Sequence, residues 1–295
     1  KRKKEKKEKN MQESNHNGLR LGTRQSDLAM WQANYVANLL NKDKNIDIIG
    51  IHTTGDKNQI KPLNGFEMKG VFTKELDKAL INHDIDLAVH CIKDLPTTLP
   101  SGLILTTILP RGIKDDIIIY KPNSKYNNIN DLYNDAKLNN KEIIIGTSAI
   151  RRQAYISKYY SPYIKCHDIR GNINTRLSKL KNENYNAIIL AKIGCDRLNL
   201  LNDQYQYEII NSIKYGHAIG QGALGIVCRS DDIKLINYLK KYNHMPSTIE
   251  IITERAFLKS LNGGCTVPIA IHMKQLDINQ YNYQLGCKLF SLNLY

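Results

Sequence analysis

Leu19-Arg20-Leu21-Gly22-Thr23-Arg24-Gln25-Ser26-Asp27-Leu28 changes from a strand pattern to a helix pattern within one short loop. Residues 19–23 are typical of a strand, and Ser26 or Asp27 can cap the helix that follows. Apolar residues recur in that helix at helical spacing: Leu28, Trp31, Tyr35 and Leu39. Arg24 therefore falls in a strand-to-helix loop, where free backbone N–H groups and the helix dipole attract an anion.

The same alternation continues along the chain and predicts an α/β fold. Strands are expected at 46–53, 86–90, 116–120, 143–145 and 187–191, with helices at 71–81, after the loop at 147–152, and at 174–181. Residues 164–168 lead into the loop at 170–172. A break at 110–112 starts a second α/β unit, and the glycine-rich residues 217–226 are expected to return the chain toward the first. The loops should gather at one edge of each sheet.

Length and charge limit the classes of protein that fit. The 295 residues, 42% of them hydrophobic, are enough for two or three domains. No stretch approaches the roughly 20 apolar residues of a membrane helix. Part of the net charge of +14 lies in residues 1–9, which lack the apolar core of a signal peptide and are either the remnant of a leader or an insertion.

The six cysteines form no CxxC pair and have no metal-ligand spacing with the histidines. This favours a reduced intracellular compartment and predicts no metal site. We expect a basic low-complexity tail at 1–17, a discontinuous first domain at 18–112 and 218–240, a second domain at 113–217, and a third at 241–295.

Leu261-Asn262-Gly263-Gly264-Cys265-Thr266-Val267-Pro268-Ile269 is expected to hold Cys265 in a glycine turn between a helix and a strand. The helix is expected to run from Ser247, which has capping-box spacing with Glu250. One face of it would carry Ile249, Ile252 and Ala256. A thiol in such a turn can be an exposed covalent attachment point. Taken alone, Cys265 is more simply a small buried apolar residue, as most free cysteines are.

Arginines recur beside Ser, Thr or Gly in short loops: Arg24, Arg151, Arg152, Arg170, Arg176 and Arg197. A guanidinium group matches a carboxylate with two parallel hydrogen bonds, so together they could bind a ligand with many carboxylates. For any one of them the alternative is a surface ion pair, worth about 0–1 kcal/mol. That alternative is weaker for Arg151 and Arg152, because adjacent cations repel unless an anion lies between them.

Asp94 is an acidic residue in this largely basic set of loops, and it follows a strand end. A carboxylate there could stabilise a cation or pass a proton. The simpler alternative is an ion pair with Lys93 within the turn.

Taken together, these motifs resemble one family, hydroxymethylbilane synthase, also called porphobilinogen deaminase. The resemblance runs from about Leu19 to about Ile271. The motifs that carry it are Leu21-Gly22-Thr23-Arg24-Gln25-Ser26, Val89-His90-Cys91-Ile92-Lys93-Asp94-Leu95-Pro96, Gly146-Thr147-Ser148, Ile150-Arg151-Arg152-Gln153, Arg170-Gly171-Asn172, Thr175-Arg176-Leu177, Gly220-Gln221-Gly222-Ala223, and Glu254-Arg255-Ala256-Phe257-Leu258 through Gly264-Cys265.

The resemblance implies an α/β protein of three domains. Two are of the type II periplasmic-binding-protein kind and flank a cleft, and a small α/β C-terminal domain carries the cofactor cysteine. It implies a transferase of tetrapyrrole (haem) biosynthesis that joins four porphobilinogen molecules head to tail with loss of ammonia. Hydrolysis then releases linear hydroxymethylbilane. The primer is a dipyrromethane cofactor, bound as a thioether to Cys265.

The resemblance also assigns roles to residues. Asp94 would be catalytic, assisting deamination and stabilising the positive pyrrole intermediate, with Lys93 beside it. Arg24, Ser26 and Arg197 would bind substrate. Besides Cys265, the cofactor would contact Arg151, Arg152, Arg170, Arg176, Ser148, Thr147, Gly171 and Gln221. A monomer without nucleic-acid or membrane partners is expected, in a plastid-type organelle or the cytosol.

Some positions depart from the family pattern. Cys91 stands where the family often has Ser, and Ala149 replaces the second of two serines. Cys195 lies in a segment that is usually more apolar, and Asp196 could compete with substrate for Arg197. The tail after Cys287 is too short for the further helix expected in the third domain, so either this end is divergent or the sequence omits residues.

Two other classes of function fit part of the sequence. A binding module could use the same two domains to capture an acidic small molecule, which leaves Cys265 and Asp94 without a role. A nucleic-acid binder would explain the positive charge. However, the arginines lie in discrete loops and show no aromatic interleaving of the kind that single-strand platforms use.

Overall fold

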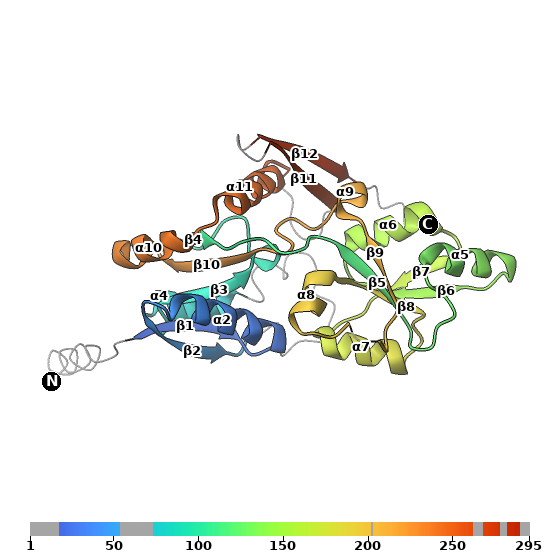
Figure 1. The fold of residues 1–295 in the computed structure, drawn as a ribbon, viewed down its shortest axis with the longest axis horizontal. Coiled ribbons are helices and arrows are strands. Elements are labelled where there is room, and N and C mark those ends of the chain that lie inside the picture. The colour runs from blue at the N-terminus through green and yellow to red at the C-terminus, as the bar shows by residue number, and fades with distance from the viewer. Residues whose placement is uncertain (1–17, 54–72, 202, 262–267, 278–281, 290–295) are drawn as a thin grey trace.

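The computed structural model describes residues 18–53, 73–201, 203–261, 268–277 and 282–289. Two five-stranded sheets with their helices lie side by side, and a long two-stranded hairpin lies along one side of both (Figure 1). This confirms the predicted α/β class. The division at 112/113, 217/218 and 240/241 stays a prediction.

The first sheet has the strand order β2-β1-β3-β10-β4. β2 and β3 pair with β1 in parallel, whereas β10 is antiparallel to β3 and to β4. Its strands are β1 Gly18–Arg24, β2 Asn45–Ile51, β3 Leu87–Cys91, β4 Leu103–Ile108 and β10 Leu224–Arg229. The insertion of β10 confirms that the glycine-rich segment returns the chain to the first unit.

The second sheet repeats this arrangement in the order β7-β6-β8-β5-β9. β7 and β8 pair with β6 in parallel, and β5 is antiparallel to β8 and β9. Its strands are β5 Asp116–Tyr120, β6 Ile143–Gly146, β7 Ile164–His167, β8 Ala187–Ala191 and β9 Tyr207–Ile210. The chain passes between the two sheets twice, at 109–115 and at 211–223.

The helices pack on these sheets and connect their strands. The first sheet carries α2 Asp27–Leu40, α4 Lys74–Ile81, α10 Ile233–Leu239 and the single turns η2 Ile92–Asp94 and η3 Lys240–Tyr242. The second carries α5 Ile129–Leu138, α6 Ile150–Tyr160, α7 Ile173–Asn182 and α8 Lys192–Arg197, and α9 Ser212–Tyr215 lies on the return crossing. Among the residues that the structure describes, no helix is long and apolar enough to cross a membrane.

Helix α2 begins as predicted, because the Ser26 side chain accepts a hydrogen bond from the Ala29 N–H. Its core face, however, is not the stripe that contains Trp31. The residues packed against the first sheet are Ala33, Val36, Ala37 and Leu40. The Trp31 side of the helix turns instead toward α8 of the second sheet.

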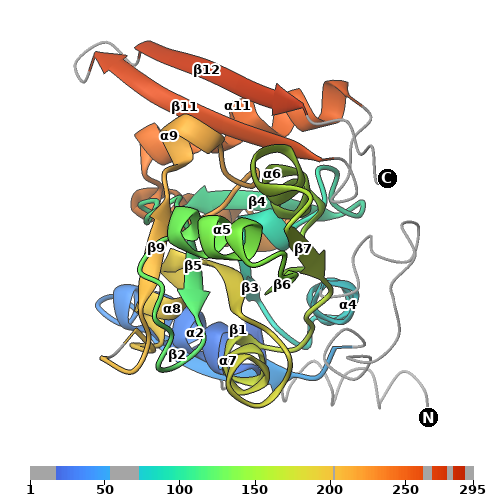
Figure 2. The ribbon, with the colours of Figure 1, turned by 90° about the vertical axis from the view of Figure 1, so that its right-hand side faces the viewer.

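The third region consists of α11 Met245–Ser260 and the antiparallel pair β11 Ile269–Asp277 and β12 Asn282–Leu289 (Figure 2). The prediction that Ser247 caps this helix is wrong: the cap is His244, whose side chain accepts from the Ser247 N–H. The predicted face is wrong as well, because Ile252 is 59% exposed and Ile251 is fully buried. Pro246 in the first turn is compatible with the earlier start.

Candidate active site

Asp94 lies on a tight turn at the end of β3. The Ile92 N–H donates to the Ala223 carbonyl at 3.1 Å, and the Leu95 N–H closes the turn onto the Ile92 carbonyl at 3.1 Å. Ile92 and Leu95 point into the core, and Asp94 is exposed between them. Within the described ranges, no hydrogen bond or ion pair involves the Asp94 carboxylate. The alternative of an ion pair with Lys93 is therefore not formed, and the carboxylate is accessible.

Arg176, on α7 of the second sheet, belongs to the electrostatic surroundings of Asp94. Its Nε donates to the Gly171 carbonyl at 2.8 Å. Burial, followed by the positive charges of Arg152 and Arg170, lowers the pKa of Arg176 to about 10, while the charge of Asp94 acts in the opposite direction. The structure thus brings together a carboxylate of the first unit and a crowded set of cations of the second.

Arg197, the last residue of α8, also connects the two units. Its Nη2 donates to the Gly222 carbonyl at 3.1 Å, and its guanidinium lies over the Trp31 ring, 5.3 Å from the centroid. Asp196, which could have competed with substrate for Arg197, pairs instead with Lys192 at 2.7 Å. One guanidinium therefore contacts both the glycine-rich return segment and α2.

Arg151 and Arg152 surround a carboxylate of the chain itself. Both donate to Asp116, the first residue of β5, and Arg152 does so at 2.7 Å. The Gln221 amide, fully buried, donates to Asp116 at 2.9 Å and accepts from Arg151 at 3.2 Å. Burial alone would raise the pKa of Asp116, but the two guanidinium charges outweigh it and hold the pKa well below its usual range. The anion expected between these arginines is Asp116.

Several predicted contact residues shape the loops around these charges. Ser148 Oγ donates to the Ile169 carbonyl at 3.0 Å and accepts from the Ile169 N–H at 3.1 Å, so it fastens the loop after β6 to the loop after β7. Thr147 is fully buried next to it. Gly171 has φ +111°, a conformation that favours glycine, so it shapes the turn that starts α7.

Arg24 is the last residue of β1, one position before the loop in which it was expected, and it is half-buried. Its positive charge affects the titration of His90 on β3, which is 6% exposed. Burial, and then the positive charge of Arg24, lower the pKa of His90 to about 4. His90 is therefore neutral at pH 7, and Arg24 keeps the only charge of this pair.

Cys265 lies outside the described residues, between the end of α11 at Ser260 and the start of β11 at Ile269. Two other cysteines, Cys91 and Cys195, lie within the described residues. Burial, and then the charge of Asp94, raise the pKa of the Cys91 thiol, and burial raises that of Cys195 to about 12. Neither Cys91 nor Cys195 has the lowered pKa of a reactive thiol.

Sequence reasoning gave no role to the ion pair between Arg111 and Glu254, which ties α11 to the crossing after β4. Arg111 Nη1 lies 2.7 Å from Glu254 and 2.7 Å from Glu250. Glu254 is fully buried and also accepts from the Gly220 N–H at 2.8 Å. The motif from Glu254 to Leu258 was the available signal, but its partners are distant in sequence.

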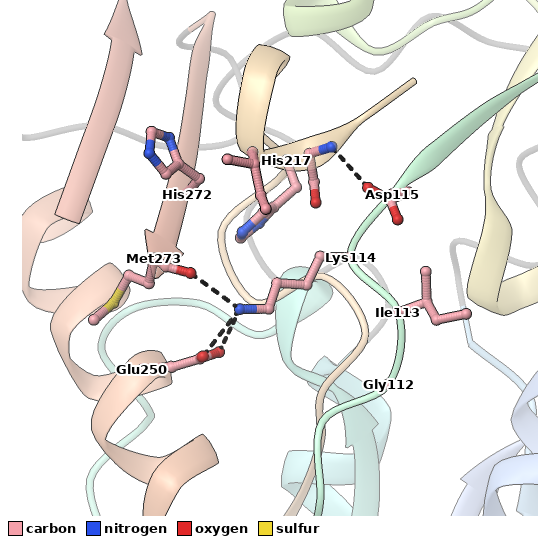
Figure 3. Close-up of a pocket in the computed structure, with 10 residues that line it drawn as sticks. Gly112, Ile113, Lys114, Asp115, His217, Glu250, His272 and Met273 are labelled. Atoms are coloured by element: carbon pink, nitrogen blue, oxygen red, sulfur yellow. Dashed lines mark hydrogen bonds and ion pairs between the residues drawn. The ribbon is translucent and has the colours of Figure 1, made fainter. Parts of the chain in front are cut away.

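A pocket of about 450 Å³ lies where the two crossings meet α11 and β11 (Figure 3). Lys114 crosses it, donating to Glu250 at 2.9 Å and to the Met273 carbonyl at 3.4 Å. None of the predicted site residues lines it: its walls are Gly112, Ile113, Lys114, Asp115, Ser212, Ile213, His217, Glu250, His272 and Met273. We therefore place the candidate active site at the Asp94 turn and not here.

Comparison with known proteins gives matches over most of the chain. Residues 19–237 match the family model "Porphobilinogen deaminase, dipyromethane cofactor binding domain", and residues 248–294 match "Porphobilinogen deaminase, C-terminal domain". The porphobilinogen deaminase of Synechococcus elongatus is 38% identical over 264 residues, covering 88% of this chain and 79% of the relative. That of Nostoc sp. is 41% identical over 257 residues, covering 86% and 76%. That of Rickettsia prowazekii is 37% identical over 280 residues, covering 94% and 89%.

Proposed function

Because the chain belongs to the porphobilinogen deaminase family, we propose that the site at the Asp94 turn performs that family's reaction, with Asp94 as its catalytic carboxylate. The activity is that of hydroxymethylbilane synthase, a transferase of tetrapyrrole biosynthesis. Four porphobilinogen molecules are joined head to tail with loss of ammonia on a dipyrromethane cofactor. Hydrolysis then releases linear hydroxymethylbilane.

The cofactor supplies the pyrrole end to which new rings are joined, and we propose that Cys265 carries it as a thioether. Its carboxylates need cations, and the chemistry of the described residues fits that need. Arg152 Nε is buried without a hydrogen-bond partner among them. The pKa of Arg176 is lowered, after burial, by neighbouring positive charges, so an incoming carboxylate would relieve their repulsion. This crowding of cations opposite Asp94 is the observation that carries the proposal.

The remaining cofactor contacts follow from these geometries. Arg151, Arg152 and Gln221 already share Asp116, so they would hold the cofactor from one rigid buried cluster. Arg170 lies 3.7 Å from an exposed carboxylate, Asp168, a pairing weak enough to exchange for a ligand. Thr147, Ser148 and Gly171 shape the loops that present these cations.

For substrate we propose Arg24, Ser26 and Arg197 as carboxylate contacts. Asp94 is exposed and has no protein partner in the described ranges, so it would be free to face the positive charge that develops on the pyrrole. Its carboxylate would stabilise that charge and assist loss of ammonia. Lys93, next to it on the turn, would offset the negative charge that substrate brings.

We propose a monomer that has no nucleic-acid or membrane partner and works in a plastid-type organelle or the cytosol. The cations that would attract nucleic acid lie instead in the loops that face Asp94. In this proposal they would surround a small acidic ligand and would not form an extended track.

The test is the intact mass of purified protein under denaturing conditions. We expect a covalent excess equal to a dipyrromethane on the peptide with Cys265, and further single-pyrrole additions after mixing with porphobilinogen. Asp94→Asn should keep the first excess but turn over very slowly. Asp196→Asn, which removes an exposed carboxylate of α8, is the matched control and should behave like the parent. An unmodified mass, or parent-like turnover of Asp94→Asn, would refute the proposal.

A further inference from the structure

The turn that carries Asp94 is held on one side by the glycine-rich return segment. The Ala223 carbonyl accepts from the Ile92 N–H at 3.1 Å. Gly220 has φ +74°, and a Cβ there would lie 2.9 Å from the backbone nitrogen of Lys93. The two backbones are therefore in direct contact, and only glycine fits at this position.

The other side of the turn is held by Arg255 of α11. Its Nη1 donates to the Leu95 carbonyl at 3.1 Å, and its Nη2 donates to the Pro96 carbonyl at 2.5 Å. These are the two carbonyls that directly follow Asp94 in the chain. A planar guanidinium that engages two consecutive carbonyls fixes both the position and the orientation of that backbone.

Helix α11 contacts both the turn itself and the return segment. Ile251, one helical turn before Arg255, is fully buried in the same apolar cluster as Ile92 and Leu95. The neighbouring Glu254 accepts from the Gly220 N–H at 2.8 Å. The helix ends at Ser260, five residues before Cys265 in the sequence.

We propose that Arg255 is a positioning residue: it fixes the Asp94 carboxylate relative to the helix that leads to the cofactor cysteine. The proposal rests on the proposed function, because it requires Asp94 to be the reacting carboxylate. Arg255 itself touches neither substrate nor cofactor in this role. A misplacement of about 1 Å at a reacting group can cost on the order of a hundredfold in rate.

The test compares Arg255→Met and Arg255→Lys with the parent, each as the full chain with its cofactor attached. Arg255→Met keeps the apolar stem and removes both donors. We expect its kcat to fall on the order of tenfold to a hundredfold, with KM for porphobilinogen within about twofold of the parent value. Arg255→Lys retains one donor group and should recover part of kcat. Intact mass should show equal cofactor loading in all three.

Lys259→Met is the matched control, because it removes an exposed cation from the next turn of the same helix. It should leave kcat and KM unchanged. If Arg255→Met unfolds, Arg255→Lys and Arg255→Gln are compared by the same two constants. An unchanged kcat in loaded variants would overturn the role of Arg255 alone, as would a loss that Arg255→Lys does not recover. An inactive parent would refute the proposed function and this role with it.

Discussion

Arg152 of α6 donates from Nη2 to Oδ1 of Asp116 across 2.7 Å, and both side chains are buried. Arg151 binds both oxygens of the same carboxylate. One internal anion therefore keeps two adjacent cations in place within the second unit. Arg151 and Arg152 are also proposed to hold the acidic cofactor. The same cluster would therefore stabilise the second unit and bind the cofactor.

The first prediction concerns this cluster. Asp116→Asn keeps the size of the side chain but leaves two guanidinium groups without their buried counter-charge. We expect a loss of about 3–5 kcal/mol in the free energy of unfolding, measured by urea titration at pH 7. Glu142→Gln, which breaks the exposed pair with Lys165, is the control and should change it by about 0–1 kcal/mol. Equal effects of the two substitutions would contradict the buried-counterion role.

A second prediction separates the two acidic partners of Arg111. Glu254 is fully buried, whereas the Glu250 side chain is 15% exposed and also binds Lys114. Glu254→Gln leaves Arg111 partly unpaired in the interior, so we expect a cost of about 3–5 kcal/mol in unfolding free energy.

Glu250→Gln should cost clearly less than Glu254→Gln, because water can solvate what remains of its pair. Urea unfolding of both variants gives the ranking. A larger loss of unfolding free energy for Glu250→Gln would show that Glu250, and not the fully buried Glu254, holds α11 in place.

The regular strands could be predicted because their signal is local. The observed bounds of β5 and β8 match the expected ranges 116–120 and 187–191, since a fully buried strand is a short continuous apolar run. β4, β9 and α5 were not predicted. The start of α11 was misplaced because Ser247 and Glu250 mimic a capping box, whereas the structure uses His244 as the cap.

The charged residues were harder to interpret than the strands. Asp116 was predicted only as a strand start, because its partners lie 35 and 36 residues away in sequence. The same holds for Arg255, whose acceptors are 160 and 159 residues away. Loop arginines could be recognised as a group, but which of them already have a carboxylate is decided by tertiary structure. The position of Cys265 falls outside the described residues.

The third prediction concerns pH and His90. Its pKa in the folded protein, about 4, lies below the ordinary value of about 6.5 in an unfolded chain. Between these values the unfolded chain binds more protons, so stability is fully present above pH 6.5 and falls as the pH drops toward 4. The contribution of His90 is up to about 1.4 kcal/mol per pH unit.

His90→Gln should therefore flatten the dependence of unfolding free energy on pH, measured by urea titration at several values between pH 7 and 4.5. His217, whose pKa is lowered to about 3, keeps its own contribution, so part of the slope should remain. Parallel curves for His90→Gln and the parent would mean that His90 titrates normally in the folded state.

The last prediction concerns the contact between Arg197 and Trp31, which joins the two units. The guanidinium lies 5.3 Å from the Trp31 ring centroid, and a cation over an indole at an exposed site gains about 0.5–1 kcal/mol. Trp31→Leu keeps an apolar side chain but removes the aromatic face, so Arg197 is held less firmly. We expect KM for porphobilinogen to rise by about two- to fivefold with kcat unchanged, because the contact serves binding. Tyr126→Leu is the control, because it removes a ring that lies 5.1 Å from the ammonium of Lys125 and has no contact with Arg197. Equal shifts in both variants would place the effect in a general loss of stability and not in the guanidinium of Arg197.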